Sequence, residues 1–163
     1  MNLMLEEVIN NEIHIVKNLY SLYLHDLSRF TETLDISADG AFHFDDLDLL
    51  WNEEGFSPYF IKHQDDVIGF LLLLERPFLK KEYDFGINDI FILNKYRGKG
   101  FGKQSIETLF KEKRGSYFVI ELTENQPAIL FWKKIYQQLK IDFEETKKHI
   151  DDEPCLIQTF TIQ

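Results

Sequence analysis

The spacing of apolar residues predicts an amphipathic helix near the start of the chain. A short strand over residues 3–6 precedes it, and from Glu12 onwards apolar side chains recur every three or four positions, the period of one helix face. These residues are Ile13, Val16, Tyr20, Tyr23, Leu27 and Phe30. Residues 31–56 carry Asp-Gly and Glu-Gly turn signals and only a weak helical period, so we predict a loop with one short helix there.

Two apolar runs in the middle of the chain predict a hairpin. They span residues 59–63 and 67–76 and are joined by the polar turn Gln64-Asp65-Asp66. The second run is apolar at nearly every position, which indicates a central strand covered on both faces.

A third long strand, over residues 83–93, leads directly into the glycine-rich segment 97–103. A helix is expected after it, because apolar residues again share one face, and Gly115 supplies a left-handed residue to end that helix. The residues on this face are Ile106, Leu109 and Phe110.

The last part of the chain predicts one more strand, a helix and a closing hairpin. The strand covers residues 117–122, and Asn125 caps a helix with Pro127 in its first turn. The hairpin consists of residues 143–150 and 155–162. This order of elements predicts an α/β fold with a mixed, mostly antiparallel central sheet flanked by helices.

Length and composition fit one folded domain over residues 1–163, with 44% hydrophobic and 28% charged residues. The longest apolar run, residues 67–74, is far short of the roughly 20 that cross a bilayer, and acids follow the first residues, so we expect neither a membrane span nor a secretory signal. The single cysteine, Cys155, makes no internal disulfide and favours a reducing, cytoplasmic location.

Charge is unevenly distributed along the chain. The formal net charge of −10 argues against nucleic acid as a partner. Residues 35–66 hold nine acids and one base, whereas residues 95–114 hold seven bases and two acids. His43 with Asp45, Asp46 and Asp48 has the composition of a metal cluster but no ligand motif, so we predict no metal site.

Closely spaced glycines between a strand and a helix predict a phosphate site. Backbone N–H groups are unpaired at a helix N-terminus, where the helix dipole also favours an anion. A Walker loop needs a glycine at the position of Arg97, and a dinucleotide fingerprint needs its third glycine at Lys103, so neither motif fits. The spacing that does occur is Arg-x-x-Gly-x-Gly, at Arg97, Gly100 and Gly102.

The stretch from Ile90 to Gly102 resembles the acetyl-CoA loop of the GNAT family of N-acetyltransferases. Asn125-x-x-Ala128-x-x-x-Trp132 resembles the second signature of that family, on the following helix. The order of elements resembles the family over nearly the whole chain. The resemblance implies a GNAT-like acyl-CoA transferase fold with acetyl-CoA as co-substrate and no metal.

The resemblance also implies which residues hold the coenzyme. The backbone of Ile92 and Leu93 would pair with the pantetheine, with an N–H near Leu93 stabilising the oxyanion, and Asn125 and Trp132 would flank the pantetheine arm. The amides that would cradle the pyrophosphate belong to Arg97, Gly98, Lys99, Gly100, Phe101, Gly102 and Lys103.

For the chemistry, the resemblance implies direct attack of an amine on the thioester. Asp89 lies where many family members carry an acidic general base, although a hydrogen-bonded strand residue explains it equally well. Trp132 lies where the family carries a tyrosine that protonates the leaving thiolate, and an indole is no acid at ordinary pH. Tyr136, one turn further on, or water would have to take this role.

Two functions therefore stay open. The first is an acetyl-CoA-dependent N-acetyltransferase that acts on a primary amine of a small molecule or peptide. The second is a non-catalytic coenzyme A binding module. In the family that the chain resembles, the segment after the first helix lines the acceptor groove, so its acids favour a cationic acceptor. Neither nucleic acid nor a membrane is expected as a partner, and a homodimer stays open.

Overall fold

Within the described residues, 3–44 and 46–163, seven strands form one sheet with helices on both faces. Asp45, one of the acids considered above, lies outside the described part of this computed structural model. The strands are β1 (Leu3–Glu7), β2 (Phe56–His63), β3 (Asp66–Glu75), β4 (Phe85–Ile92), β5 (Gly115–Leu122), β6 (Phe143–Ile150) and β7 (Glu153–Ile162). The helices are α1 (Ile13–Leu27), α2 (Asp46–Leu50), α3 (Phe101–Glu112) and α4 (Gln126–Gln138), with 3-10 turns η1 (Asn10–Glu12) and η2 (Asn94–Tyr96).

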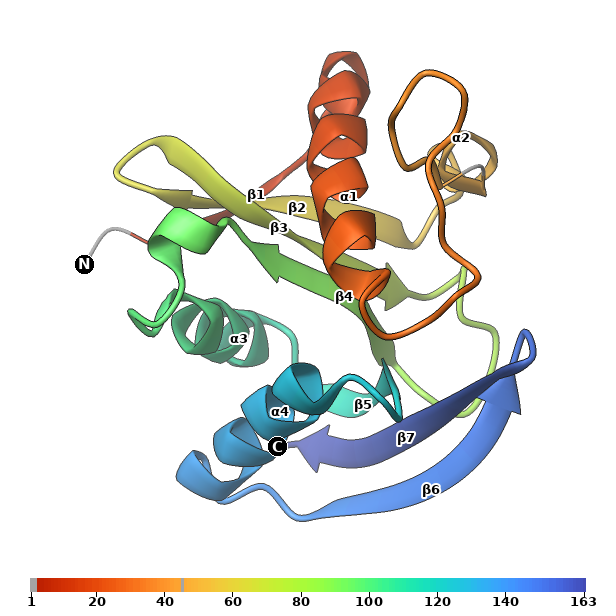
Figure 1. Cartoon of the computed structure of the whole chain (residues 1–163). Helices are drawn as coiled ribbons and strands as arrows, with labels where there is room; N and C mark the ends of the chain where they lie inside the picture. Colours follow the sequence, from red (N-terminus) through yellow and green to blue (C-terminus); the bar gives the residue numbers. More distant parts are fainter. Residues whose placement is uncertain (1–2, 45) are drawn as a thin grey trace.

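The strand order is β1-β2-β3-β4-β5-β7-β6, as Figure 1 shows. β4 and β5 run parallel, and each of the other neighbouring pairs among the described strands is antiparallel. The predicted mixed, mostly antiparallel sheet flanked by helices is confirmed. The described helices include none with the length and apolar character needed to cross a bilayer.

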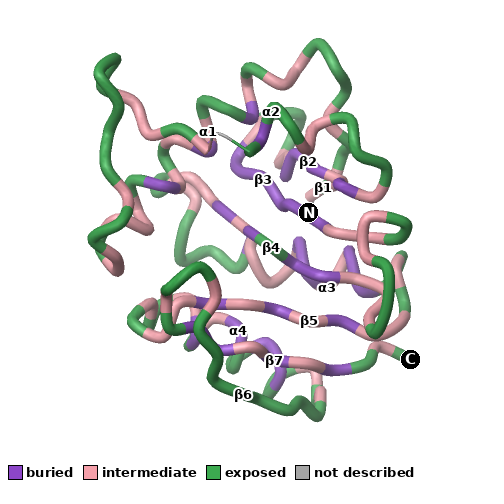
Figure 2. The backbone as a smooth tube through the Cα atoms, turned by 90° about the vertical axis from the view of Figure 1, so that its right-hand side faces the viewer, coloured by how far each residue is buried: buried purple, intermediate pink, exposed green. Residues whose placement is uncertain are grey.

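The sheet separates two apolar cores. On one face, α1 and α2 pack over a cluster that includes Phe70 and Leu72 of β3. On the other face, α3 and α4 cover a cluster that includes Leu71 and Leu73 of the same strand. Because successive side chains of a strand point to opposite faces, β3 is buried on both sides, as the sequence predicted. The purple segments of β3 in Figure 2 show this burial.

The parallel pair β4–β5 opens towards the C-terminal ends of its strands. Pairing between the two strands joins Phe85, Gly86 and Ile87 to residues 117–119 and is not found beyond them in the described chain. At the same point the register between β3 and β4 shifts, so that Asn88 is an extra residue in β4. The remaining residues of β4 therefore diverge from β5, and a gap opens in the middle of the sheet.

Gly115 does not end α3 in the way the sequence analysis expected. The helix ends at Glu112, Lys113 is already extended, and Gly115 is the first residue of β5. A Cβ atom on Gly115 would lie 2.4 Å from a carboxylate oxygen of Asp84. That carboxylate accepts hydrogen bonds from Ser116, so Gly115 is needed for a close approach between two segments and not for a helix end.

Candidate functional site

The glycine loop leaves the N-terminus of α3 uncovered. Gly98 and Gly100 have φ angles of +76° and +83°, a left-handed conformation that glycine adopts without strain, and Gly100 caps α3. A Cβ atom on Gly98 would find nothing within 4 Å, and one on Gly100 only the Gln104 side chain at 3.8 Å. The backbone amides that open α3 therefore face unoccupied space, as a phosphate site requires.

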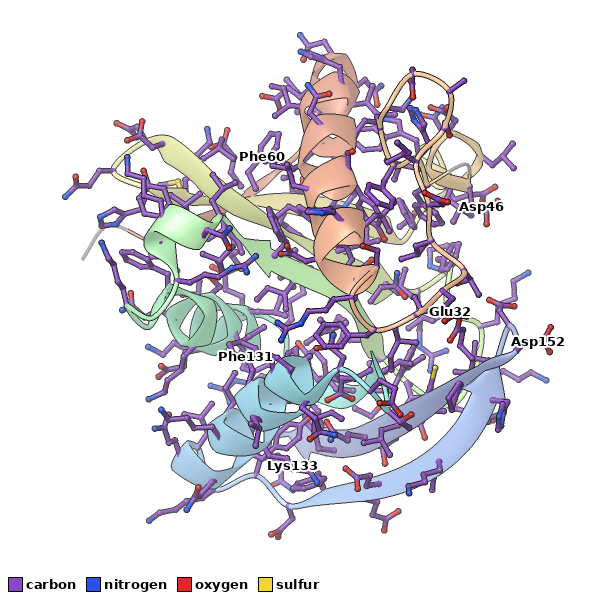
Figure 3. All side chains as sticks on the ribbon, in the orientation of Figure 1. Glu32, Asp46, Phe60, Phe131, Lys133 and Asp152 are labelled. Atoms are coloured by element: carbon purple, nitrogen blue, oxygen red, sulfur yellow. The ribbon has the colours of Figure 1, made fainter. Side chains whose placement is uncertain are left out.

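Gly102 has a different environment from the other two glycines. It lies in the first turn of α3, and a Cβ atom there would be 2.8 Å from the ring of Phe131 on α4. Figure 3 labels Phe131 at the junction of the two helices. The missing side chain of Gly102 thus allows α3 and α4 to pack closely, which is sufficient to explain the residue without a ligand.

Arg97 connects the end of β4 to the end of α1. Its Nε donates to the Ile92 carbonyl at 2.6 Å, its Nη2 donates to Asp26 at 2.6 Å, and its guanidinium lies 5.3 Å above the ring of Phe91. These contacts fix the start of the loop. The two lysines of the loop are available to an anion, because Lys99 is exposed and, among residues 3–44 and 46–163, Lys103 has only Glu107 at 3.8 Å as an ionic neighbour.

Alternate residues of β4 direct their backbone N–H groups towards the gap between β4 and β5. The N–H of Leu93 donates to the Ile68 carbonyl of β3 at 2.8 Å. Because bonded and non-bonded pairs alternate in an antiparallel ladder, the N–H groups of Ile90 and Ile92 point away from β3 towards β5, which does not pair with them. The N–H groups that face the gap thus belong to Ile90 and Ile92, of which Ile92 is nearer the glycine loop, while the N–H of Leu93 is already used.

Asn125 and Trp132 lie on the other side of the gap. Since β4 and β5 are parallel, the helices that follow them both begin at the same end of the sheet, where ligands of α/β folds commonly bind. Asn125 caps α4 by accepting a hydrogen bond from the Ala128 N–H at 3.2 Å. Trp132 is 3% exposed and packs edge-on against Phe131, so it belongs to the core beneath α4.

Asp89 is buried on the opposite face, under α1. It is 8% exposed and accepts hydrogen bonds from the Tyr20 hydroxyl at 2.5 Å and from the Asn88 amide at 2.8 Å. Burial raises the pKa of Asp89, whereas the hydrogen bonds from these partners and from Tyr23 oppose the rise. Tyr20 and Tyr23 belong to the apolar stripe predicted for the first helix. That pattern does not predict a hydrogen bond to Asp89, which is far away along the chain.

A small cavity of about 100 Å³ lies beside Tyr20. It lies between α1 and the segment that leads into α2, and it is lined by Lys17, Tyr20, Phe42, His43, Phe44, Leu47 and Asp48. Tyr20 therefore lines this cavity and also, through its hydroxyl, donates a hydrogen bond to Asp89.

The acids of residues 35–66 do not form one patch. Asp48 pairs with Lys17 at 2.5 Å, and Asp39 pairs with His43 at 2.8 Å, both near α2. The turn between β2 and β3, which contains Asp65 and begins β3 at Asp66, lies on the other side of α1 from α2 (Figure 1). No group of three or more metal-ligating side chains is found within residues 3–44 and 46–163.

Glu121 is a second buried acid, and the sequence analysis missed it. It is 5% exposed, and neither of its carboxylate oxygens has a hydrogen-bond partner among the described residues. Burial raises the pKa of Glu121 to about 8, with a further increase from the charge of Glu145 and a decrease from Lys133. The available signal was its inward position in β5, where Tyr117 and Val119 occupy the alternate places before it.

Tyr136, the alternative acid on α4, has its hydroxyl engaged elsewhere. It donates to Oε1 of Gln158 at 2.7 Å, and Nε2 of Gln158 donates to Glu145 at 3.0 Å. Burial raises the pKa of Tyr136 well above its ordinary value. This tyrosine is 1% exposed, so its hydroxyl belongs to a buried network between α4 and the sheet.

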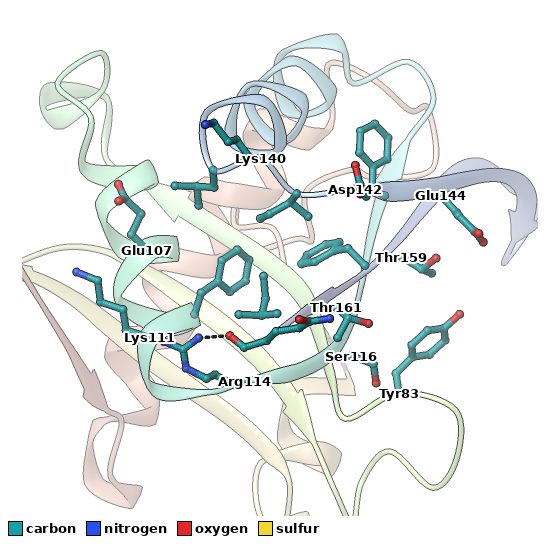
Figure 4. A pocket seen from close by; sticks show the side chains of 17 residues that line it. Tyr83, Glu107, Lys111, Arg114, Ser116, Lys140, Asp142, Glu144, Thr159 and Thr161 are labelled. Carbon is teal, nitrogen blue, oxygen red and sulfur yellow. Dashed lines mark hydrogen bonds between the residues drawn. The ribbon is translucent and has the colours of Figure 1, made fainter.

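A larger cavity, of about 880 Å³, lies at the far ends of α3 and α4. Figure 4 shows its walls, with Lys111 from the end of α3 and Arg114 just after that helix, Lys140 after α4, and Thr159 and Thr161 from β7. Because Ser116 near the start of β5 also lines it, this cavity is at the opposite end of the helices from the glycine loop.

The chain matches the model of the acetyltransferase (GNAT) family over residues 17–136. It is similar in structure to an acetyltransferase from Thermus thermophilus, with a TM-score of 0.70 and 14% identity, covering 98% of this chain and 96% of that one. It is also similar to AAC(6')-Ib in complex with paromomycin and acetyl-CoA (TM-score 0.68, 17% identity, 99% and 94% covered). A third similar structure is the ribosomal-protein-S18-alanine N-acetyltransferase of Escherichia coli, with a TM-score of 0.63 and 12% identity, covering 99% of this chain and 95% of that one. No curated protein sequence matches the chain.

Proposed function

The chain belongs to the GNAT family of acetyltransferases, and from that premise we propose that it transfers an acetyl group from acetyl-CoA to a primary amine. The observation that carries the proposal is the glycine loop, where Gly98 and Gly100 expose the N-terminus of α3 beside the gap between β4 and β5. One structural neighbour is named an aminoglycoside acetyltransferase and another a ribosomal-protein-S18-alanine N-acetyltransferase, so the fold does not set the acceptor.

The residues present fit the coenzyme. The amides from Gly98 to Lys103 would bind the pyrophosphate at the N-terminus of α3, and Lys99 and Lys103 would add positive charge. The amide of Asn125 would reach the pantetheine arm from the other side of the gap. Acetyl-CoA supplies an acyl group already activated as a thioester, so the protein mainly has to orient the reactants and stabilise charge.

We assign the oxyanion contact to the N–H of Ile92. This donor faces the gap and fits the sequence-based expectation of an N–H near Leu93, whereas the N–H of Leu93 itself is bonded to Ile68. The Arg97 bond to the Ile92 carbonyl fixes the following peptide, Ile92–Leu93, and so restrains the strand end that carries this N–H. A fixed N–H can stabilise developing negative charge without reorganising during the reaction.

We assign the general base to Asp89 acting through Tyr20. Asp89 is too buried to meet an amine directly, but Tyr20 lines the cavity beside α2 and its hydroxyl donates to Asp89. An ammonium group in this cavity would give its proton to the Tyr20 oxygen as Tyr20 passes its own proton to Asp89. Burial raises the pKa of Asp89, which makes this carboxylate a stronger base than an exposed one.

The alternative of a non-catalytic coenzyme A binding module is favoured by one observation, the burial of Asp89 beneath Tyr20. A panel of amines, assayed with acetyl-CoA and a free-thiol readout, separates the two functions. Turnover with any primary amine supports the enzyme, whereas binding of acetyl-CoA without turnover of the panel supports the module.

A thermal-shift titration tests the coenzyme site itself. A ligand that binds only the folded state adds about 2.7 kcal/mol of apparent stability at 100 times its dissociation constant. We expect a rise in Tm of several degrees with millimolar acetyl-CoA. An unchanged Tm would remove the support for both functions.

A further inference from the structure

Glu121 is a buried acid whose partner is missing from the described chain. The side chain is only 5% exposed, and neither of its carboxylate oxygens takes part in a hydrogen bond with the described residues. Leaving a buried carboxyl unpaired is costly, and such groups in native proteins usually serve a ligand, a reaction or an ordered water. This inference rests on the proposed function, in which acetyl-CoA would be the ligand that Glu121 serves.

The position of Glu121 places it at the gap in the sheet. The last pair between β4 and β5 joins Ile87 to Val119. Because side chains alternate along a strand, Glu121 is the next residue after Val119 that faces α4. From the β4 side, the N–H of Ile92 faces the same gap. Glu121 is thus the first inward side chain of β5 beyond the point where the strands separate.

Burial keeps Glu121 protonated against the charges around it. On its face of the sheet lie Lys133 and Tyr136 of α4 and Glu145 of β6. Cys155 of β7 pairs with Leu122 and faces the other side of the sheet, as Asp89 of β4 does. Burial dominates, and it raises the pKa of Glu121 to about 8, with Lys133 lowering it and Glu145 raising it. At pH 7 the side chain is therefore a neutral carboxylic acid that can give up a proton.

The other candidate acids are less suitable. Trp132 has an N–H that does not ionise at ordinary pH. The Tyr136 hydroxyl already donates to Gln158 inside the network beneath α4. Glu121 differs from both, because its carboxyl is protonated and has no bond within the described chain to give up.

We propose that Glu121 donates the proton that the coenzyme sulfur takes up when the thioester breaks. The amine nitrogen forms the new C–N bond, the C–S bond breaks with its electron pair on sulfur, and the Glu121 proton forms the thiol. The proton lost by the amine goes to Asp89 through Tyr20 and is released to water, and water returns a proton to Glu121. The sum is an amine and a thioester giving an amide and a thiol.

Infrared difference spectroscopy tests the contact without any acceptor amine. The carbonyl stretch of protonated Glu121 is identified at pH 6.5 by its absence in Glu121→Gln. We expect this band to shift when coenzyme A binds and to stay in place with desulfo-coenzyme A, which lacks the sulfur. A band that responds equally to both ligands, or to neither although both bind, would overturn the proposal.

The pH dependence of turnover gives a second test. With an accepted amine, we expect Glu121→Gln to lower kcat by about 10²-fold and to abolish the falling limb of the parent profile at high pH, with the dissociation constant of coenzyme A unchanged. Glu121→Asp should recover part of the rate, because it restores an acid. The matched control Glu145→Gln removes a neighbouring carboxylate and should keep the limb.

The two tests distinguish this inference from the function beneath it. A parent protein that does not bind coenzyme A fails the proposed function, and the inference falls with it. A parent that binds and acetylates, with a Glu121→Gln variant of equal rate and equal pH profile, retains the function and refutes the role of Glu121 alone. If the parent binds without turnover, the infrared comparison decides.

Discussion

Gly100 and Gly40 share a left-handed backbone conformation, with φ of +83° at both. We expect Gly100→Val and Gly40→Val to lose similar stability, on the order of 1–2 kcal/mol, because a β-branched residue is strained there. Only Gly100→Val should also lose the acetyl-CoA-induced rise in Tm, since its side chain would occupy the space in front of α3. An equal ligand response in both variants would show that the loop holds no phosphate.

Glu121 should impose a measurable pH dependence on stability. Its ordinary pKa is about 4.5 and its folded pKa about 8, so between these values the folded chain holds a proton that the unfolded chain has released. The free energy of unfolding therefore falls as pH rises through this window, by at most about 1.4 kcal/mol per pH unit. Glu121→Gln should remove this slope, as urea unfolding at pH 5, 6.5 and 8 would measure.

Glu145 provides the control for that measurement, because its pKa is lowered by hydrogen bonds from Gln158 and Lys133. The stability that Glu145 contributes is present above its ordinary pKa and is lost as pH falls. Glu145→Gln should thus differ from the parent without removing the slope between pH 5 and 8. A Glu121→Gln variant that keeps the parent slope would mean that Glu121 ionises normally in the folded chain.

Asp89 and Tyr20 should behave as one unit in turnover. Asp89→Asn should lower kcat by roughly 10²–10⁴-fold with unchanged affinity for acetyl-CoA, because proton transfer is lost. Tyr20→Phe keeps the ring between Phe44 and Phe70 but removes the relay hydroxyl, so we expect a comparable loss. Steady-state kinetics of Asp89→Asn and Tyr20→Phe measure these losses. The control is Tyr23→Phe, because Tyr23 does not line the cavity. Equal values of kcat in all three variants would refute the relay.

At the scale of elements, the contact between α3 and α4 depends on one missing side chain. A Cβ atom on Gly102 would lie 2.8 Å from the Phe131 ring, so we expect Gly102→Ala to lower the free energy of unfolding by about 1–3 kcal/mol through overpacking. The double variant Gly102→Ala, Phe131→Leu should recover much of this loss, because the two sites are coupled. Chemical denaturation of Gly102→Ala, Phe131→Leu and the double variant measures the coupling, and strictly additive losses would place the strain elsewhere.

The elements themselves were largely predictable, because their signals are local. The three- and four-residue period gave α1, the apolar run gave β3, and the Arg-x-x-Gly-x-Gly spacing gave the loop before α3. The family resemblance read from that loop and from Asn125 is confirmed by the family match over residues 17–136. The roles of the individual site residues remain predictions.

The features that the sequence did not reveal depend on neighbours brought together by folding. Gly115 is a glycine because Asp84 lies against it, and the Leu93 N–H is used because Ile68 pairs with it across the sheet. No local pattern encodes either contact. Glu121 is a comparable case, since an acid at an inward strand position looks like a break in the apolar alternation until its burial and its missing partner are known.

For the whole molecule, the placement of charge separates two surfaces that the sequence had grouped together. The acids near α2 stand beside the cavity at Tyr20, whereas Asp65 and Asp66 lie on the other side of α1. A net charge of −10 attracts every cation weakly, but only the acids near the cavity can guide one to Tyr20. Removal of the same number of acids from each surface therefore separates attraction by acids near the cavity from attraction by the net charge.

Two double variants with the same change in net charge make that comparison. We expect Asp46→Asn, Asp48→Asn, two changes on α2 beside the cavity, to lower kcat/KM several-fold for an amine with additional positive charge. Asp65→Asn, Asp66→Asn should leave it nearly unchanged. The preference for cationic amines should fade towards 1 M salt, where the screening length is about 3 Å. Kinetics at low and high salt measure both effects, and equal losses in the two variants, or a preferred acceptor that is anionic, would contradict an acceptor site beside α2.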